Sequence, residues 1–258
     1  MKKEIRIFLT ALMFYTRIPV PKTVDHSDEF LNKATRYLPL IGIIVGSISG
    51  LVFYGAQFLL PPSVAIILSF IAGIFVTGAF HEDGLADVCD GFGGGWTKEK
   101  ILLIMKDSRI GAYGAIGLIM MFMLKFSILS AIASSAIPLV LIAGHALSRF
   151  VALTFIFTDT YARTDESSKS MAVTNKPKFY NWLIAGAFGI APLFFLGNYY
   201  VFFLIFPLFL MKAFLGRYFR KWIGGYTGDC LGATQQICEV LFYLCFIILS
   251  KILVWKYS

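Results

Sequence analysis

The chain has 258 residues, of which 58% are hydrophobic and only 15% are charged, and its mean hydropathy is +0.75. These values exclude an ordinary soluble domain and predict a membrane protein. The net charge of +8 would suit nucleic acid binding. In a membrane protein, however, the basic residues must first be assigned to one side of the bilayer, because topology alone can account for them. The four cysteines form no CxxC pair, so we expect free thiols rather than a zinc site or disulfides.

The first 15 residues combine a basic start with a short, interrupted apolar stretch, and no small-residue cleavage site follows them. They predict a short interfacial or buried helix rather than a signal peptide. Seven later segments approach the roughly 20 apolar residues that a membrane-spanning helix needs. No internal repeat or low-complexity linker divides them, so we expect one integral-membrane domain over residues 1–258, folded as an all-α polytopic bundle. The expected spans are residues 37–60, 62–80, 111–134, 136–158, 179–196, 198–215 and 236–255.

The connections between these spans alternate between two kinds. Three are tight and contain no Lys or Arg; they lie at Pro61–Pro62, at Ser135 and at Gly197–Asn198. The long ones contain 19 of the 23 basic residues and comprise residues 1–36, 81–110, 159–178 and 212–235. The positive-inside rule then puts the N-terminus and the long connections in the cytoplasm and the C-terminus outside. Because topology accounts for most of the positive charge, we expect no nucleic acid partner.

Three aspartates lie within the stretch HEDGLADVCDGFGGG, which follows the second expected span. Asp83, Asp87 and Asp90 are spaced i, i+4 and i+7, so on a helix continuing from that span they would occupy a wedge of about 60°. Like charges on one face repel each other, and nearby lipid adds a desolvation cost. A divalent cation would remove the conflict, and oxygen ligands favour Mg²⁺ or Mn²⁺. Solvated loop charges are the alternative, but they do not explain the helical spacing.

A second polar stretch, KDSRIGAYG, precedes the third expected span. Asp107 is a candidate fourth metal ligand, and Lys106 and Arg109 are candidates for binding phosphoryl oxygens, with Ser108 between them as a substrate contact. Anchoring at the membrane surface would account for both cations equally well. The preceding glycine run could end the helix and admit an anion, but no GK[ST] follows it, so it is not a Walker A loop.

Ionisable residues within or beside the expected spans leave several alternatives open. His145 and Arg149 lie one turn apart in the fourth span, where Arg149 can contact substrate or pair with a carboxylate. Arg17 and Arg36 can bind an anionic substrate or lipid headgroups. Lys125 can snorkel to the membrane surface, so we assign it no role.

Two further features bear on the site. His81 points away from the aspartate face on an ideal helix and is open to roles as ligand, base or helix-end residue. The last long connection, GGYTGDCLGATQQICEV, is rich in glycine, so we expect a loop that folds over the site, with Asp229 and Glu239 completing it.

A carboxylate-bound metal beside cations in a membrane bundle indicates phosphoryl or phosphodiester transfer at the cytoplasmic face. The residues alone do not identify donor and acceptor.

Five stretches together resemble one known family. They are FYTRIPVP, RYLPLIGIIVG, HEDGLADVCDGFGGG, KDSRIGAYG and GYTGDCLGATQQICE, in this order, and the resemblance as a whole extends from about residue 8 to residue 240. The chain is similar to adenosylcobinamide-GDP ribazoletransferases, also called cobalamin synthases. The resemblance implies a multi-pass enzyme of the bacterial inner membrane with its site on the cytoplasmic side and Mg²⁺ as cofactor. The resemblance is compatible with a homo-oligomer.

The reaction implied by the resemblance joins α-ribazole, or α-ribazole 5′-phosphate, to adenosylcobinamide-GDP late in cobalamin biosynthesis. The ribose 3′ hydroxyl attacks the cobinamide-linked phosphorus, and GMP leaves. On this interpretation the metal ligands and catalytic residues are Asp83, Asp87, Asp90 and Asp107, while Lys106 and Arg109 bind the diphosphate.

Two other classes remain as alternatives. A CDP-alcohol phosphatidyltransferase also has a DG pair with an alanine two residues later, but Asp87 stands where that pattern has arginine, and a second aspartate pair is missing. A seven-span cation transporter would place its carboxylates near the middle of the bilayer in interrupted helices. Here they follow the second span at its cytoplasmic end.

Overall fold

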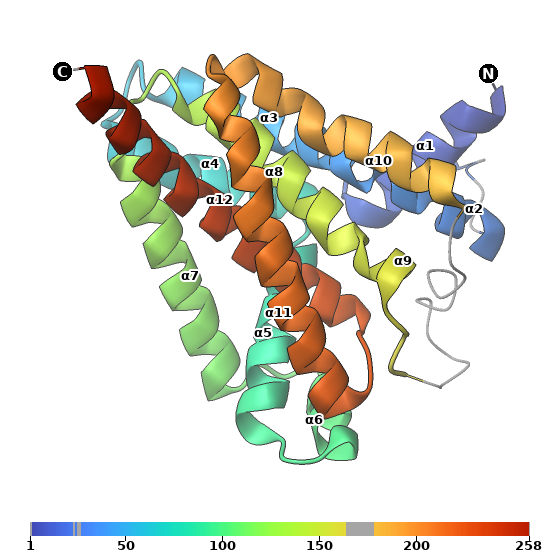
Figure 1. Ribbon diagram of the computed structural model, residues 1–258. Helices are drawn as coiled ribbons and strands as arrows, with labels where there is room; N and C mark the ends of the chain where they lie inside the picture. The colour runs from blue at the N-terminus through green and yellow to red at the C-terminus, as the bar shows by residue number, and fades with distance from the viewer. Residues whose placement is uncertain (1, 23, 25–26, 164–177, 258) are drawn as a thin grey trace.

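The structure is a computed structural model that describes residues 2–22, 24, 27–163 and 178–257. Its regular elements in these parts of the chain are all helical, and the only strand-like pairing in them is one isolated bridge (Figure 1). The elements are α1 (Lys2–Tyr15), α2 (Asp28–Ala34), η1 (Thr35–Tyr37), α3 (Leu38–Ala56), α4 (Pro62–Thr77), α5 (Phe80–Gly94), α6 (Lys98–Ile104), α7 (Ala112–Ser130), α8 (Ile137–Leu153), α9 (Phe155–Thr158), α10 (Phe179–Ile190), η3 (Ala191–Leu196), η4 (Tyr199–Leu204), α11 (Ile205–Ile223) and α12 (Gly228–Tyr257).

Six stretches in the described residues are long and apolar enough to cross a membrane. The pair α4 and α5 makes a seventh candidate, bent by 92° at its break. The expected all-α, polytopic membrane bundle is therefore confirmed. Of the long connection expected at residues 159–178, residues 164–177, with Lys169 and Lys176, lie outside the described part of the chain. The six stretches are Glu29–Ala56, Ala112–Ser130, Ile137–Thr158, Phe179–Leu196, Tyr199–Ile223 and Gly228–Ile252.

The helix that carries the three aspartates does not continue straight from the second span, which corrects the expectation. Gly78 and Ala79 both adopt left-handed backbone angles, with φ of 66° and 59°, and a residue in this conformation commonly ends a helix. The N–H of Gly78 still bonds to the carbonyl of Ile74 at 2.7 Å, which closes the last turn of α4. The chain then turns into α5, which holds all three aspartates, so their shared helical face is preserved.

The expected glycine-rich loop, residues 224–235 of the last long connection, is also wrong, because α11 extends to Ile223 and α12 begins at Gly228. The N–H of Cys230 bonds to the Thr227 hydroxyl at 3.3 Å at the start of α12. Cys230 and Cys238 are buried in the same core, so tertiary packing outweighs the low helix propensity of the glycines.

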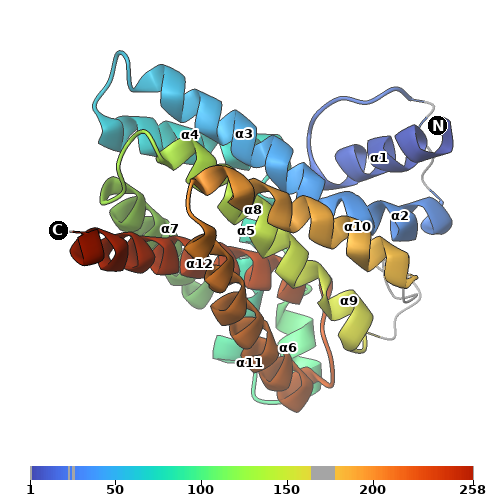
Figure 2. The ribbon, with the colours of Figure 1, turned by 45° about the horizontal axis from the view of Figure 1, so that its top comes forward.

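The centre of the bundle is α8, most of whose residues are buried (Figures 1 and 2). It packs most closely against α3, where glycines at positions 42, 46 and 50 face its backbone. A Cβ on Gly46 would lie 2.7 Å from the Cα of Ile142, closer than real Cβ atoms approach. Small residues of this kind let membrane helices pack backbone to backbone.

The N-terminal segment forms a helix, as expected, and α1 buries one face against the bundle through Ile7, Ala11 and Tyr15. Figure 1 shows α5 and α6 gathered with the ends of α7 and α11 at the bottom of the view, away from both termini. The polar stretches singled out in the sequence therefore lie mainly at this end of the molecule.

Candidate active site

Two of the polar stretches meet where α5 crosses α12. A Cβ on Gly84 would lie 2.9 Å from the carbonyl oxygen of Asp229 and 3.3 Å from the Cα of Gly232, so the two backbones are nearly in contact. Residues larger than glycine would force the helices apart at this point. The crossing brings Asp83 and Asp87 of α5 to the same region as Asp229 of α12, as their mutual charge interactions show.

The carboxylates of this acidic cluster, defined as Asp83, Asp87 and Asp229, are poorly neutralised. Asp83 is exposed and Asp87 is half-buried, and neither side chain forms a hydrogen bond or ion pair with the residues that the structure describes. Asp229 accepts hydrogen bonds from Arg163 Nη2 at 2.8 Å and from the Thr227 hydroxyl at 3.3 Å. Three carboxylates with one paired cation leave excess negative charge, which suits a cation or a cation-bound substrate.

Asp90, the third residue of the predicted metal face, has a different environment. Its Oδ2 accepts the backbone N–H of Gly111 at 2.7 Å and its Oδ1 that of Gly114 at 2.8 Å, so it caps the N-terminus of α7. A side chain at either glycine would clash with the Asp90 carboxylate. The spacing of the glycines in RIGAYG is thereby explained, while metal binding by Asp90 stays a prediction.

Asp107 lies in an exposed turn and interacts mainly with Arg109. It accepts the backbone N–H of Arg109 at 3.1 Å and its side-chain Nε and Nη2 at 3.2 and 2.8 Å. Hydrogen bonds from Arg109 hold the pKa of Asp107 below its usual value, and the same contacts raise the pKa of Arg109. Ser108 is exposed in the same turn. None of these hydrogen bonds joins the turn to the acidic cluster.

A basic cleft of about 390 Å³ lies beside the acidic cluster. Lys98, Lys106 and Arg163 line it, and Arg163 also bonds to Asp229 and, at 3.5 Å, to the carbonyl of Met105. The cleft therefore connects the KDSRIG stretch with the first turn of α12. It combines cations with neighbouring carboxylates, an arrangement that can bind a metal-associated phosphate group.

Arg163 is the residue that the sequence analysis missed, having counted it only as a loop charge. It is positioned by a short bridge in which the N–H of Ala162 bonds to the Tyr226 carbonyl at 2.8 Å and that of Tyr226 to the Thr160 carbonyl at 2.9 Å. A side chain at Gly225 would clash with Thr160. The only sequence signal was the glycine pair before Tyr226, which permits this close approach.

Two other predicted anion-binding residues, Arg36 and Arg17, contact parts of the protein outside the acidic cluster. Arg36 is buried, pairs with Glu4 and donates to Asn181 Oδ1 at 3.0 Å. Arg17 is exposed and lies beside Gly78 at the break between α4 and α5. The hydrogen bonds and ion pairs described for these arginines do not reach the acidic cluster, so their contact with substrate remains a prediction.

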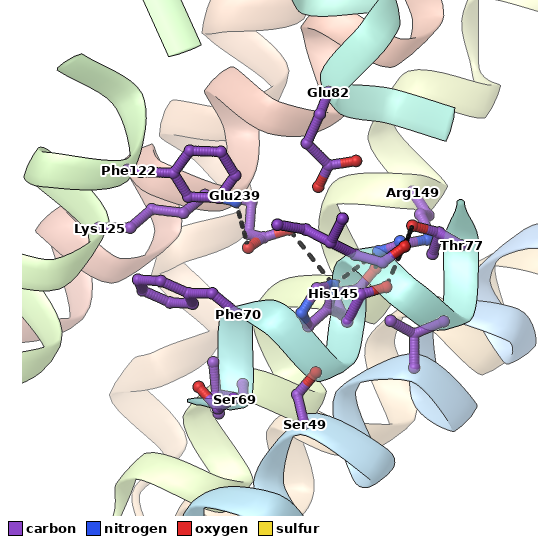
Figure 3. A pocket seen from close by; sticks show the side chains of 14 residues that line it. Ser49, Ser69, Phe70, Thr77, Glu82, Phe122, Lys125, His145, Arg149 and Glu239 are labelled. Carbon is purple, nitrogen blue, oxygen red and sulfur yellow. Dashed lines mark hydrogen bonds and ion pairs between the residues drawn. The ribbon is translucent and has the colours of Figure 1, made fainter. Parts of the chain in front are cut away.

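A second group of charged residues is enclosed within the bundle (Figure 3). The ammonium group of Lys125 donates to Glu239 Oε1 and to Gln236 Oε1, both at 2.7 Å, and Lys125 is only 3% exposed. The expectation that Lys125 snorkels is therefore wrong, because an internal carboxylate gives it a partner. Glu239 also accepts from Tyr243 at 3.1 Å and lies 3.3 Å from His145 Nδ1.

Arg149 belongs to this inner polar network, defined as Lys125, His145, Arg149, Gln235, Gln236, Glu239 and Tyr243. Its Nη1 lies 2.9 Å from His145 Nδ1 and 3.0 Å from the His145 carbonyl oxygen. The cavity that this group lines measures about 20 Å³, which is room for about one water molecule. Of the two roles left open for Arg149, the geometry fits internal packing. Glu239 likewise lies within the network, whereas Asp229 joins the acidic cluster.

The comparisons with known proteins bear on which reaction this site performs. The family model for cobalamin-5-phosphate synthase matches residues 7–247. The chain belongs to this family. It is 49% identical over 245 residues to an adenosylcobinamide-GDP ribazoletransferase of Shewanella frigidimarina, covering 94% of each chain. Relatives with the same description from Shewanella sp. strain W3-18-1 and Shewanella oneidensis are 46% and 45% identical over 258 residues, covering 97% of each chain. No solved structure gives a significant match.

Membership of the cobalamin-5-phosphate synthase family agrees with the resemblance seen in the sequence. The matched region includes every residue of the acidic cluster, the basic cleft and the inner polar network. It therefore favours this family over the phosphatidyltransferase and transporter alternatives.

Proposed function

We propose that the protein is an Mg²⁺-dependent adenosylcobinamide-GDP ribazoletransferase that acts in the last steps of cobalamin biosynthesis. Its substrates would be adenosylcobinamide-GDP and α-ribazole or α-ribazole 5′-phosphate. The ribose 3′ oxygen forms a bond to the cobinamide-linked phosphorus, the bond to the departing phosphate breaks, and GMP leaves. The products are adenosylcobalamin, or its 5′-phosphate, and GMP. Family membership and the names of the relatives support this reaction.

The observation that carries the proposal is the acidic cluster, in which Asp83 and Asp87 have no ion pair among the described residues and lie beside a basic cleft. The described residues contain no group of three His, Cys, Asp or Glu side chains that could hold a metal by themselves. Mg²⁺ is commonly held by one or two carboxylates together with substrate phosphates and water. Asp83 and Asp87 fit that pattern, with the substrate diphosphate completing the ligand set. When bound, Mg²⁺ would offset charge on the transferring phosphoryl group.

The remaining roles belong to side chains around this pair. Arg163 and Lys106 would bind diphosphate oxygens, and Asp229 would hold the guanidinium of Arg163 in place through its 2.8 Å hydrogen bond. A carboxylate without an ion pair can also accept the proton released by the attacking hydroxyl. Asp83 and Asp87 are the two candidates for that step.

We further propose that the acidic cluster faces the cytoplasm and that the protein resides in the bacterial inner membrane. Two of the long basic connections, residues 81–110 and 212–235, support this orientation, because they adjoin the end of the bundle at which α5 and α6 lie (Figure 1). The orientation is tested by labelling the variant Ser108→Cys in intact cells. A membrane-impermeant reagent should react only after lysis, and labelling of intact cells would contradict the orientation.

The test of the activity uses purified protein in nanodiscs with adenosylcobinamide-GDP, α-ribazole and Mg²⁺. We expect GMP and a corrinoid carrying the ribazole to appear in equal amounts, and neither product when α-ribazole or Mg²⁺ is omitted. GMP formed without ribazole would indicate a hydrolase. Absence of GMP under all conditions would refute the proposed function.

A further inference from the structure

A second pocket, of about 220 Å³, lies beside the contact between α5 and α12. We infer that it binds the base of the ribazole substrate, a flat, two-ring and mostly apolar group with one unsubstituted ring nitrogen. This inference rests on the proposed function and names the part of the protein that recognises the accepting nucleoside.

The walls of this base pocket are apolar and largely aromatic. Its lining includes Phe14, Tyr15, Phe80, Tyr161 and Tyr226. Phe14, Tyr15 and Phe80 contact one another edge to face, with ring centroids 4.9 to 5.8 Å apart, and Tyr161 meets Tyr226 in the same way at 5.5 Å. Such surfaces bind another aromatic ring by stacking and edge contacts.

The size of the pocket restricts its occupant. Pockets for drug-sized ligands usually measure about 300–1,000 Å³, so a cavity of 220 Å³ holds a single fused ring system rather than a corrinoid. A purine base would also fit by size. However, a purine carries several polar ring atoms, and the described walls offer few partners for them, so burial of a purine would cost free energy.

The polar groups of these walls are the tyrosine hydroxyls and the imidazole of His81. His81 lines the pocket and is only 4% exposed, and its Nδ1 has no hydrogen-bond partner among the described residues. A buried polar atom without a partner costs about 1–3 kcal/mol. An imidazole can donate a hydrogen bond to the unsubstituted nitrogen of a benzimidazole-type base. Binding of the base would therefore give the imidazole of His81 a hydrogen-bond partner.

The pocket is next to the acidic cluster along the chain and in space. Gly228 lines the pocket, and the following residue, Asp229, belongs to the cluster. Likewise Tyr161 lines the pocket, while Arg163, two residues later, bonds to Asp229. A base held here would direct its attached ribose toward the first turn of α12, where the phosphoryl group would be bound.

A comparison that changes the protein and the nucleoside, singly and together, tests the hydrogen bond between His81 and the base. His81→Phe keeps a ring in the wall but removes both nitrogens, and an indole riboside lacks the free ring nitrogen of the benzimidazole. Each change alone should raise the KM for the nucleoside about tenfold, with the KM for adenosylcobinamide-GDP unchanged. The two changes together should raise it no further. Additive losses, or an unchanged KM in His81→Phe, would overturn the assignment of His81.

A second variant tests the pocket itself in case His81→Phe fails to fold. Leu231→Trp would fill the pocket, whereas Leu241→Trp changes a partly buried leucine of the same helix that does not line it. Only Leu231→Trp should raise the KM for α-ribazole, by at least about tenfold, and free dimethylbenzimidazole should compete with α-ribazole in the wild type. Equal KM values in both variants, or non-competitive inhibition, would contradict the inference. Loss of GMP release in the wild type would refute the proposed function instead.

Discussion

The acidic cluster and the inner polar network both contain carboxylates and basic residues, but they differ in how completely these are paired. In the network, Glu239 contacts Lys125, Tyr243 and His145 within 3.3 Å, and the enclosed space holds about one water molecule. In the cluster, Asp83 and Asp87 have no ion pair among the described residues and lie beside a cleft of about 390 Å³.

This difference separates a structural role from a binding role. A buried charge must find its partner within the protein, because breaking such a pair leaves an uncompensated charge in a poorly polarisable interior. An accessible carboxylate can instead remain unpaired until a ligand neutralises it. Changes in the network should therefore affect mainly stability, and changes in the cluster should affect mainly turnover.

The largest expected effect is on turnover in Asp83→Asn and Asp87→Asn. Removing either negative charge should reduce the rate of GMP release by at least about 10²- to 10⁴-fold, because the metal-associated diphosphate and the proton acceptor both depend on these carboxylates. The melting temperature should stay close to that of the wild type. Glu29→Gln, on the exposed surface of α2, where the carboxylate makes a surface ion pair with Lys33, is the control and should retain activity. Near-normal turnover in either aspartate variant would contradict the role of the cluster.

The next effect concerns the inner polar network. Glu239→Leu leaves the ammonium of Lys125 buried without its carboxylate and should lower the free energy of unfolding by about 3–5 kcal/mol. The double variant with Lys125→Met removes both charges and should recover much of this loss. Thermal unfolding in detergent provides the measurement. If Glu239→Leu unfolds like the wild type but stops GMP release, the network takes part in the reaction.

A smaller effect is expected for Arg163, which links the two halves of the site. Arg163→Met should slow GMP release about 10- to 100-fold and raise the KM for adenosylcobinamide-GDP, since the cleft loses a cation that pairs with phosphate. Arg163→Lys should restore part of the activity because it keeps the charge without the paired geometry. Equal kinetics in Met and Lys variants would show that charge at this position does not matter.

The smallest effect is a pH-dependent contribution from Asp159. Burial alone would raise the pKa of this carboxyl, but hydrogen bonds from Lys212 and Thr158 and the charges of Lys212 and Arg220 outweigh burial and hold it below 3.8. The stabilisation is thus complete above about pH 4 and is lost as the pH falls through the folded-state pKa. The wild type should melt a few degrees above Asp159→Asn at pH 7, and the gap should narrow toward pH 3. A constant gap would contradict this linkage.

Much of the bundle could be predicted because a membrane-spanning helix needs a long apolar run, which a single sequence displays. The helical spacing of Asp83 and Asp87 was equally visible, and both lie on α5. The break at Gly78 and Ala79 was not, since one glycine in an apolar run does not reveal two left-handed residues. The early start of α12 was hidden because its glycines look like a loop, although Gly232 permits contact with α5.

The residues that sequence analysis misjudged depend on distant partners. Lys125 is buried because Glu239, on another helix, balances its charge, and no local pattern indicates that pairing. Arg163 joins the site through a bridge to Tyr226, far along the chain. Asp90 has the spacing of a metal ligand, yet it caps α7 through Gly111 and Gly114. The roles of these residues therefore depend on partners elsewhere in the fold, which the local spacing of residues does not reveal.

Metal-directed cleavage tests most directly whether the acidic cluster holds the metal. With Fe²⁺ in place of Mg²⁺, adenosylcobinamide-GDP bound, and ascorbate with peroxide added, hydroxyl radicals should cut the backbone near Asp83 and Asp87 in α5 and near Asp229 in α12. Excess Mg²⁺ should suppress these cuts, and Asp87→Asn should abolish them. Cleavage centred instead on the inner polar network, near Lys125 and His145, would contradict the account.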